Sequence, residues 1–393
     1  MMSKKSPQLR FEGFTDDWEE RKLENIAQIN KGIQRGKQEI SSVRNELNPY
    51  PVYNGGKKAS GYTDECNREN SVMVSEGGAS AGYVNYYSGK YWSGGHNFTI
   101  SNDTKHDTFF LLYVLQKSQE KLYKLQVGTG LPNIQLKSIK DFPIYSTSNT
   151  EQQKIGSFFK QLDNTIALHQ RKLDLLKEQK KGFLQKMFPK NGAKVPELRF
   201  AGFADDWEER KLGNLSQDTI GGGTPKTSVT EYWNGEIPWI QSSDLANDKL
   251  YGVLPKKFIT EDAVKNSATK LIPANSIAIV TRVGVGKLAF MPYEFASSQD
   301  FLSLSNLQVD CNFGMYSIYK MLQRELNNIQ GTSIKGITKA DLLDKETFVP
   351  IKVEEQQKIG SFFKQLDDII DLHQRRLDLL KEQKKGFLQK MFI

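Results

Sequence analysis

The sequence predicts an α+β fold: two strand-rich mixed domains and two long helices packed as an antiparallel coiled coil, in a pseudo-two-fold tandem repeat. This prediction rests on two repeated segments and on the difference between the stretches that separate them. Residues 7–26 recur at 196–215, and residues 151–188 recur at 355–392 with only four differences. The stretches between these repeats share almost no running identity. A duplicated frame therefore carries two different inserts.

The repeats divide the 393 residues into seven parts, and this length favours more than one hydrophobic core. In chain order the parts are a lead-in segment (1–26), a first insert (27–150), a long helix (151–188), a linker (189–195), a second lead-in segment (196–215), a second insert (216–354) and a second long helix (355–393). Whatever the frame does, it does twice; whatever the inserts do, they do differently.

The repeat at 151–188 has the pattern of one amphipathic helix. Its apolar stripe advances mostly by alternating threes and fours, at positions Ile155, Phe158, Phe159, Leu162, Ile166, His169, Leu173, Leu176, Lys180, Phe183 and Met187. Such a helix cannot bury its stripe alone, and the second copy is the obvious partner. Antiparallel packing about a pseudo-two-fold axis is the simplest arrangement for two like helices that each follow an insert. Parallel packing is the alternative.

Each insert reads as strand-rich with one late amphipathic helix. β-branched and aromatic runs bounded by glycine predict strands at 71–75, 82–87, 276–281 and 301–305. Helices are expected at 108–126 and 313–330, each before a Gly-Thr pair. The parallel order predicts that the inserts are divergent copies of one fold.

Composition is that of a soluble globular protein, with 38% hydrophobic and 25% charged residues. No apolar run is long enough to span a membrane. Cys66 and Cys311 form no CxxC pair, which favours reduced thiols and a cytoplasmic location. The net charge of +8 is compatible with a nucleic-acid partner, but the excess lies mainly on the first insert and the repeated helices, whereas the lead-in segments are acidic.

The order of parts resembles the specificity subunit of a type I restriction–modification system over essentially the whole chain. The resemblance rests on P-x-L-R-F-x-G-F-x-x-D-W-E-E-R-K-L, an insert and a long helix beginning E-Q-Q-K-I, followed by all three again. Local motifs of the second insert also fit: Gly223-Thr224-Pro225-Lys226, Tyr232-Trp233, Gly235-Glu236-Ile237-Pro238-Trp239 and Asp244. No single motif carries the resemblance; their combination does.

The resemblance implies a sequence-specific DNA-binding subunit in the bacterial cytoplasm. Each insert would be a target recognition domain that reads one half of an asymmetric bipartite double-stranded target. The helices would set the spacing, and two methyltransferase subunits would dock on the frame and methylate adenine. Two restriction subunits would add ATP-dependent cleavage. The chain itself would be non-catalytic, and S-adenosylmethionine, ATP and Mg²⁺ would belong to the partners.

A coiled-coil adaptor with two protein- or glycan-binding heads is the alternative, because the second insert is almost neutral. A self-sufficient nuclease is disfavoured. No phosphate-binding loop or metal-binding carboxylate pattern is present, and the four histidines are scattered, so no catalytic or metal residue is assigned. A solvated helix face explains Glu178-Gln179-Lys180 better than a nuclease motif does.

The DNA contacts are expected on loops of the inserts, where glycine permits close backbone approach and polar side chains reach groove edges. The candidates of the first insert are Lys31, Arg35, Lys37, Tyr53, Asn54, Lys57, Lys58, Ser75, Ser80, His96, Asn97, Thr129 and Asn133. Those of the second are Thr224, Lys226, Gln241, Ser242, Thr281, Arg282, Lys287, Ser298, Gln299, Ser333 and Lys335.

Side-chain chemistry suggests a role for some of these candidates. Arg282 suits guanine, whereas Gln299 and Asn97 suit adenine edges. The lysines at 57, 58, 226 and 287 suit phosphates, so loss of Lys287 should weaken binding across sequences and lower the salt slope by about one. Trp233 and Trp239 are expected in the core rather than as base-stacking platforms.

Overall fold

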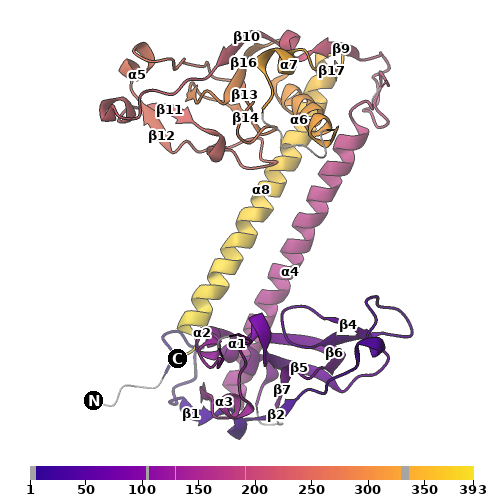
Figure 1. Ribbon diagram of the computed structural model, residues 1–393, viewed down its shortest axis with the longest axis vertical. Coiled ribbons are helices and arrows are strands. Elements are labelled where there is room, and N and C mark those ends of the chain that lie inside the picture. The colour runs from indigo at the N-terminus through magenta and orange to yellow at the C-terminus, as the bar shows by residue number, and fades with distance from the viewer. Residues whose placement is uncertain (1–5, 103–105, 129, 191, 329–335) are drawn as a thin grey trace. The chain divides into compact units, whose positions relative to one another are not determined.

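The computed structural model describes residues 6–102, 106–128, 130–190, 192–328 and 336–393 (Figure 1). Its contacts divide the chain into two compact units: residues 1–171 with 374–393, and residues 172–373. Both long helices, α4 (Asn149–Lys186) and α8 (Val353–Lys390), contribute one part to each unit. No helix of the described residues is long and apolar enough to cross a membrane.

The first unit is built on a six-stranded sheet of order β2-β7-β5-β6-β3-β4. Before α4 its elements are β1 (Glu19–Lys22), η1 (Leu23–Asn25), β2 (Ala27–Lys31), η2 (Lys37–Glu39), β3 (Tyr50–Tyr53), β4 (Gly61–Thr63), β5 (Arg68–Ser75), η3 (Gly78–Ser80), β6 (Val84–Ser93), β7 (Asn97–Asn102), α1 (Thr108–Lys117), α2 (Gln119–Tyr123), α3 (Leu136–Lys140) and β8 (Pro143–Ser146). The single helix expected at 108–126 is two helices with Ser118 between them, so that expectation was wrong in detail.

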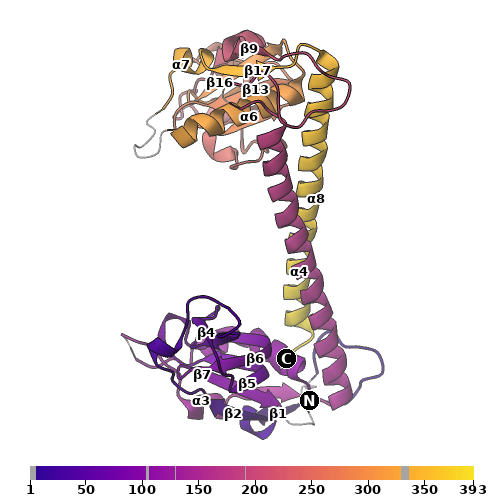
Figure 2. The ribbon, with the colours of Figure 1, turned by 90° about the vertical axis from the view of Figure 1, so that its right-hand side faces the viewer.

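The second unit repeats the strand order of the first. Its elements before α8 are β9 (Glu208–Lys211), η4 (Leu212–Leu215), β10 (Ser216–Gly221), η5 (Thr230–Trp233), β11 (Ile237–Ile240), η6 (Ser242–Asp244), β12 (Lys257–Ile259), α5 (Glu261–Lys265), β13 (Ser276–Val280), β14 (Leu288–Met291), β15 (Ala296–Ser297), β16 (Phe301–Leu307), α6 (Cys311–Asn328), α7 (Lys339–Leu343) and β17 (Glu346–Val349). Within this unit β13, β16, β17 and α6 lie together (Figure 2).

The sheets of the two units match strand for strand. β10-β16-β13-β14 corresponds to β2-β7-β5-β6, and β12-β11-β15 corresponds to β4-β3-β6. The long β6 of the first unit is divided into β14 and β15 in the second. Each unit has the same parallel pair, Val52 with Trp92 and Trp239 with Ala296. In the first unit this pair lies within the six-stranded sheet, whereas in the second it lies within a three-stranded sheet separate from the four-stranded one. The two inserts therefore share one fold.

The long helices run antiparallel in each unit. In the first unit Phe158, near the start of α4, packs on Phe387, near the end of α8, with ring centroids 5.2 Å apart. In the second unit Phe183 packs on Phe362 at 5.1 Å. Every position of the predicted stripe is buried or half-buried, because α4 turns this face toward its partner. The antiparallel prediction is confirmed within each unit.

In each unit a lysine and an aspartate form an ion pair between the helices. Lys180 of α4 contacts Asp367 of α8 at 2.5 Å in the second unit, and Lys384 contacts Asp163 at 2.6 Å in the first. Lys180 is only 9% exposed. The interpretation of Glu178-Gln179-Lys180 as a solvated face is therefore wrong for Lys180, because its ammonium group is needed inside the helix pair.

The lead-in segment ties the two helices of each unit together. In the first unit Arg10 forms a bidentate pair with Glu151 at the start of α4, at 2.6 and 2.8 Å. The neighbouring amide of Leu9 donates to the carbonyl of Lys390 at the end of α8, at 2.8 Å. Glu151 is fully buried, and its hydrogen bond raises the pKa of Arg10. The second unit repeats this clamp with Arg199 and Glu355.

A glycine and a glutamine of the E-Q-Q-K-I-G motif seat the late helix of each insert on the long helix. Gln152 accepts from the amide of Asp107, and Asp107 in turn caps the start of α1. A Cβ on Gly156 would lie 2.1 Å from an Asp107 oxygen and 3.0 Å from the Phe110 nitrogen. Only glycine permits this close approach, which explains why the residue is glycine in both copies.

The end of each long helix enters the core of one unit. Phe392, after α8, packs against Trp18, Phe110 and Phe159 with ring centroids 5.7–6.1 Å apart. In the second unit Phe188, after α4, packs in the same way against Trp207, Phe313 and Phe363. The Met-Phe pair that follows α8 therefore belongs to the core of the first unit. The Met-Phe pair that follows α4 belongs to the core of the second unit.

Replacing either buried phenylalanine should destabilise its unit. We expect Phe392→Ala and Phe188→Ala each to cost about 3–5 kcal/mol, because each leaves a cavity among aromatic rings. Leu379→Ala and Leu175→Ala are matched controls on the same helices, since both side chains are more than half exposed. Denaturant unfolding measures the difference. A Phe392→Ala protein as stable as the Leu379→Ala control would refute this role.

Candidate nucleic-acid interface

Five loops of the first unit converge at one end of its sheet. The amide of Gly32 donates to the carbonyl of Asn97, and the amide of His96 donates to the side chain of Asn54. The amide of Glu76 donates to the carbonyl of His96, and that of Gly78 to Pro132. The segments predicted to carry contacts, at 31–37, 53–58, 75–80, 95–97 and 129–133, of which residue 129 lies outside the described residues, are thus tied together by hydrogen bonds from backbone amides.

The corresponding loops of the second unit converge in the same way. The amide of Gly223 donates to Ser297, and Thr224 donates its hydroxyl to the side chain of Gln299. The amide of Ser298 donates to Ile240, and the amide of Thr281 donates to Asp300. The loops at 222–226, 240–245, 281–287 and 297–300 therefore form one surface.

The strand register shows that the two clusters are equivalent. Val74 pairs with Phe98 in the first unit, and Val280 pairs with Phe301 in the second. The next pair along the same two strands is also equivalent: Ser75, the last residue of β5, pairs with Asn97, the first of β7, and Thr281, just after β13, bonds to Asp300, just before β16. The pairing of Val74-Ser75 with Val280-Thr281, inferred from sequence order, is confirmed at the level of the strands.

A close backbone approach builds both clusters. A Cβ on Gly32 would lie 2.0 Å from the carbonyl oxygen of Gly94, and one on Gly222 would lie 2.0 Å from that of Ser298. Any side chain at either glycine would push its loop away from the turn before the next strand. Glycine at these two positions therefore brings the first loop of each insert into the cluster.

Four candidate residues are buried, and for these the expected groove contact is corrected. Ser75, Asn97, Thr281 and Ser298 are 2–7% exposed. The Ser75 hydroxyl accepts from the amide of Gly56, and the Asn97 amide group donates to Ser93. Thr281 donates to the Asp300 carbonyl. These short polar side chains hold the loops together, because a buried polar group needs an internal partner.

Three candidate cations have partners inside their own domain. Lys31 pairs with Glu76 at 2.7 Å. The Arg35 side chain is 10% exposed, and its guanidinium group lies 4.5 Å from the Trp92 ring centroid and pairs with Asp64 and Glu65. The Lys287 ammonium donates to the carbonyls of Leu245 at 2.9 Å and Ser242 at 3.4 Å. The phosphate role expected for Lys287 is corrected, because its ammonium group already donates to two backbone carbonyls of the protein.

Several other candidates are half-buried. Tyr53 packs against Tyr87 and Tyr91, and burial raises its pKa. Asn54, Ser80, Thr224, Gln241 and Ser242 are half-buried on the converging loops. Thr129, Ser333 and Lys335 lie outside the described residues.

The remaining candidates are exposed on the loop surfaces: Lys37, Lys57, Lys58, His96 and Asn133 in the first unit, and Lys226, Arg282 and Gln299 in the second. Lys57 lies 5.3 Å from the Tyr83 ring centroid. Within the described part of the chain Lys37, Lys58, Lys226 and Arg282 make no ion pair. Their charges are therefore available to a polyanion at either loop cluster.

The two tryptophans of the second insert position the Gly-Thr-Pro-Lys loop. Trp239 is 3% exposed, and its indole donates to the carbonyl of Gly223 at 3.0 Å. Trp233 packs edge-on against it at 5.0 Å and donates to the carbonyl of Lys226 at 3.3 Å. Neither presents a stacking face of the kind that single-stranded nucleic acid requires. Their indoles hold the loop that carries Thr224 and Lys226.

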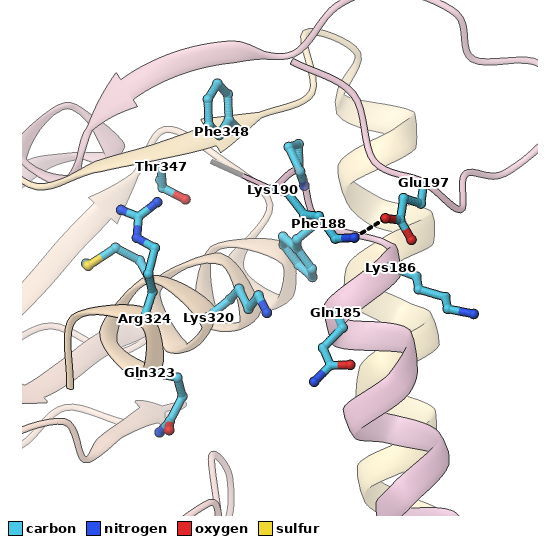
Figure 3. Close-up of a pocket in the computed structure, with 12 residues that line it drawn as sticks. Gln185, Lys186, Phe188, Lys190, Glu197, Lys320, Gln323, Arg324, Thr347 and Phe348 are labelled. Atoms are coloured by element: carbon cyan, nitrogen blue, oxygen red, sulfur yellow. Dashed lines mark hydrogen bonds and ion pairs between the residues drawn. The ribbon is translucent and has the colours of Figure 1, made fainter. Parts of the chain in front are cut away.

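A separate pocket of about 670 Å³ lies in the second unit between the end of α4, α6 and β17 (Figure 3). Lys186, Lys190, Lys320 and Arg324 supply its positive charge, and Lys190 pairs with Glu197. Burial and the nearby Arg324 guanidinium lower the pKa of Lys320. None of the predicted contacts lines this pocket, so it is not part of the loop cluster.

Residue-type reasoning missed the groups that hold the interface in place. Glu76, which pairs with Lys31, and Leu245, whose carbonyl accepts from Lys287, carry no motif signal. The Arg10–Glu151 clamp was missed too, although both residues recur in the second copy as Arg199 and Glu355. That recurrence was the available signal. In the described residues no three acidic, histidine or cysteine side chains gather as a metal site would require.

The chain is similar to known proteins along nearly its whole length. A family model described as "Type I restriction modification DNA specificity domain" matches twice, at residues 15–178 and 204–382. The MjaIX specificity subunit of Methanocaldococcus jannaschii is 30% identical over 192 residues, 48% of this chain and 44% of that relative. A putative MjaX specificity subunit from the same organism is 22% identical over 95% of this chain and 92% of its own.

Solved structures show the same fold. A crystal structure of a type I restriction–modification S subunit from M. genitalium superposes with a TM-score of 0.73 at 19% sequence identity, covering 99% of both chains. At this identity the likeness concerns the fold alone.

Replacing Lys287 should separate scaffolding from phosphate contact. We expect Lys287→Met to weaken DNA binding about equally across sequences and to leave the slope of log K against log salt unchanged, because the lysine supports residues 242–245 from inside. Lys226→Met, at an exposed and unpaired lysine of the same unit, should lower the slope by about one. A slope change of one for Lys287→Met would restore the phosphate role.

Proposed function

The chain belongs to the family of type I restriction–modification DNA specificity subunits, and from this membership we propose that it reads an asymmetric bipartite DNA target. The observation that carries the proposal is the pair of equivalent loop clusters. Both are built at the same strand ends by the same close glycine approach, yet their exposed side chains differ. One fold that presents two different polar surfaces suits two different half-sites read in one binding event.

The repeated frame is the part that we propose docks two copies of one partner. The lead-in segments and long helices are nearly identical in both copies, including residues that face solvent. Leu168 and Leu175 of α4, and Leu372 and Leu379 of α8, are more than half exposed. Like surfaces bind like partners, and two methyltransferase subunits meet that requirement. Recent duplication alone is the alternative explanation of this identity.

The chemistry of the complex lies, in this proposal, in the partner subunits. The methyltransferase subunits would use S-adenosylmethionine to methylate one adenine in each half-site. Two restriction subunits would hydrolyse ATP with Mg²⁺ and cut unmodified DNA. This chain would contribute recognition and spacing without a catalytic residue of its own, in the bacterial cytoplasm.

Methylome sequencing of a host that carries the chain with its methyltransferase tests the proposal directly. We expect one bipartite motif, with methylated adenines in two unlike half-sites separated by unspecified bases. A matched host in which residues 216–354 are replaced by a second copy of 27–150 should methylate a motif whose two halves are alike. A single continuous motif, or no motif despite assembly of the complex, would contradict bipartite reading.

Arg282→Ala tests base reading by one residue. Arg282 is exposed on the β13–β14 turn and makes no ion pair among the described residues, so its guanidinium can reach a guanine edge. We expect relaxed preference at one base of one half-site, worth about 1–3 kcal/mol, and an unchanged preference in the other half. Competition binding with single-base variants measures both. Equal weakening for every sequence would show that Arg282 contacts phosphate only.

A further inference from the structure

The two long helices, otherwise identical over the repeat, differ at positions that the repeated frame does not explain. The differing pairs are Asn164/Asp368, Thr165/Ile369, Ala167/Asp371 and Lys172/Arg376. Two of them add a carboxylate to α8 that α4 lacks. The structure places both carboxylates next to side chains that contact the second insert; nothing in it explains the other two differences.

One added carboxylate contacts a connection of the second insert, and the other pairs with a lysine of α8 that contacts the same connection. Lys249 lies 3.4 Å from Asp371 of α8. Lys364 of α8 lies 4.8 Å from the Tyr251 ring centroid, and it pairs with Asp368 at 2.6 and 2.7 Å. In the first unit the counterpart of Lys364, Lys160, lies instead 4.2 Å from the Phe109 ring centroid. Asn164 and Ala167 could not form either ion pair.

The connection that carries Lys249 and Tyr251 has no counterpart of equal length in the first insert. It joins β11 to β12 as residues 241–256, whereas residues 54–60 join β3 to β4. Leu245 and Leu250 are each 2% exposed, so the connection is folded onto the domain. Asp248 accepts from Tyr319 at 2.7 Å, and Tyr251 donates to Asn312 at 2.9 Å. We call residues 245–251 the strap.

The strap begins directly after the loop cluster. Gln241 and Ser242 belong to that cluster, and Lys287 donates to the carbonyls of Ser242, the first residue of η6, and of Leu245, which follows η6. A few residues later the strap reaches α8. It therefore joins the candidate DNA-reading surface to the long helix of the same unit by a short, well-packed piece of chain.

We propose that the strap fixes the orientation of the second recognition domain on α8, and that Asp368 and Asp371 are positioning residues for it. These two positions then belong to the second domain's specificity unit and not to the common frame. The inference rests on the proposed function for its consequence in DNA reading. The contact itself, strap against helix, is independent of that function.

Exchanging residues between the two copies gives a matched test. The variant Asp368→Asn with Asp371→Ala carries the side chains that the first copy already has at these positions. The control, Asn164→Asp with Ala167→Asp, places the carboxylates on α4. Hydrogen exchange of residues 245–251 in the full chain should rise about two- to fivefold in the first variant, as expected for exposed ion pairs, and stay unchanged in the control.

Reversing the charges of the Lys249–Asp371 pair tests whether this ion pair holds the strap on α8. Lys249→Asp alone should raise the hydrogen-exchange rate of residues 245–251. Adding Asp371→Lys should return that rate toward the original value. On the complex with its DNA target, Asp368→Asn with Asp371→Ala should reduce base discrimination about two- to fivefold in the half-site read by the second domain and leave the other half-site unaffected. A purely structural weakening of the helices would alter both half-sites.

The outcomes separate the two proposals. Unchanged strap exchange in the Asp368→Asn, Asp371→Ala variant overturns the strap, whether or not the chain binds DNA. Equal loss of discrimination in both half-sites overturns the positioning role as well. If the hydrogen-exchange rate of residues 245–251 rises in this variant but the chain protects no DNA, the proposed function is refuted and the strap is established.

Discussion

The rest of the structure depends on one clamp, made twice. Arg10 holds the buried carboxylate of Glu151 at the start of one long helix, while the neighbouring amide of Leu9 bonds the last turn of the other. A buried carboxylate without its guanidinium is strongly destabilising, so the lead-in segment cannot leave without exposing or stranding a charge at the start of the long helix. The antiparallel pairing, the place of the Met-Phe ends in the cores and the seat of each insert on its helix all follow from it.

Because each insert is attached to its long helix in the same way, the exposed residues of its loops can differ without loss of the fold. In both units the loops are joined by backbone hydrogen bonds and by buried hydroxyl and amide groups, such as Ser75 and Thr281. Those contacts occupy the hydrogen-bonding groups of the short polar side chains. Longer side chains, such as Lys226 and Arg282, remain exposed at the surface. Each loop therefore contains both kinds of residue: buried ones that hold the loop in place and exposed ones that are available to contact DNA. Where the second insert adds a longer connection, the helix beneath it has changed as well, at Asp368 and Asp371.

Much of the fold could be predicted because it is encoded by period and by repetition. The three-four spacing of the stripe from Ile155 to Met187 predicts a helix with one apolar face, and a duplicated stripe supplies its partner. Apolar runs such as 276–281 and 301–305 predict buried strands. The loop segments that converge were also predictable, because strand ends gather at the edges of a sheet. The break at Ser118 was not, because it does not interrupt the local hydrophobic pattern. The division of β6 into β14 and β15 had a local signal in Pro292, which follows β14 directly.

The sequence by itself determined that there are two copies of one frame, two unlike inserts and a pair of long helices. The tertiary structure alone decided which polar side chains are available. Asn97 and Gln299 have similar chemistry, yet Asn97 is buried in β7 and Gln299 is exposed on a turn. Lys287 and Lys226 carry the same charge, but backbone carbonyls from a distant connection bind one and solvent surrounds the other. Residue type fixes what a side chain can bind, whereas burial and long-range contacts fix whether a partner inside the protein already occupies it.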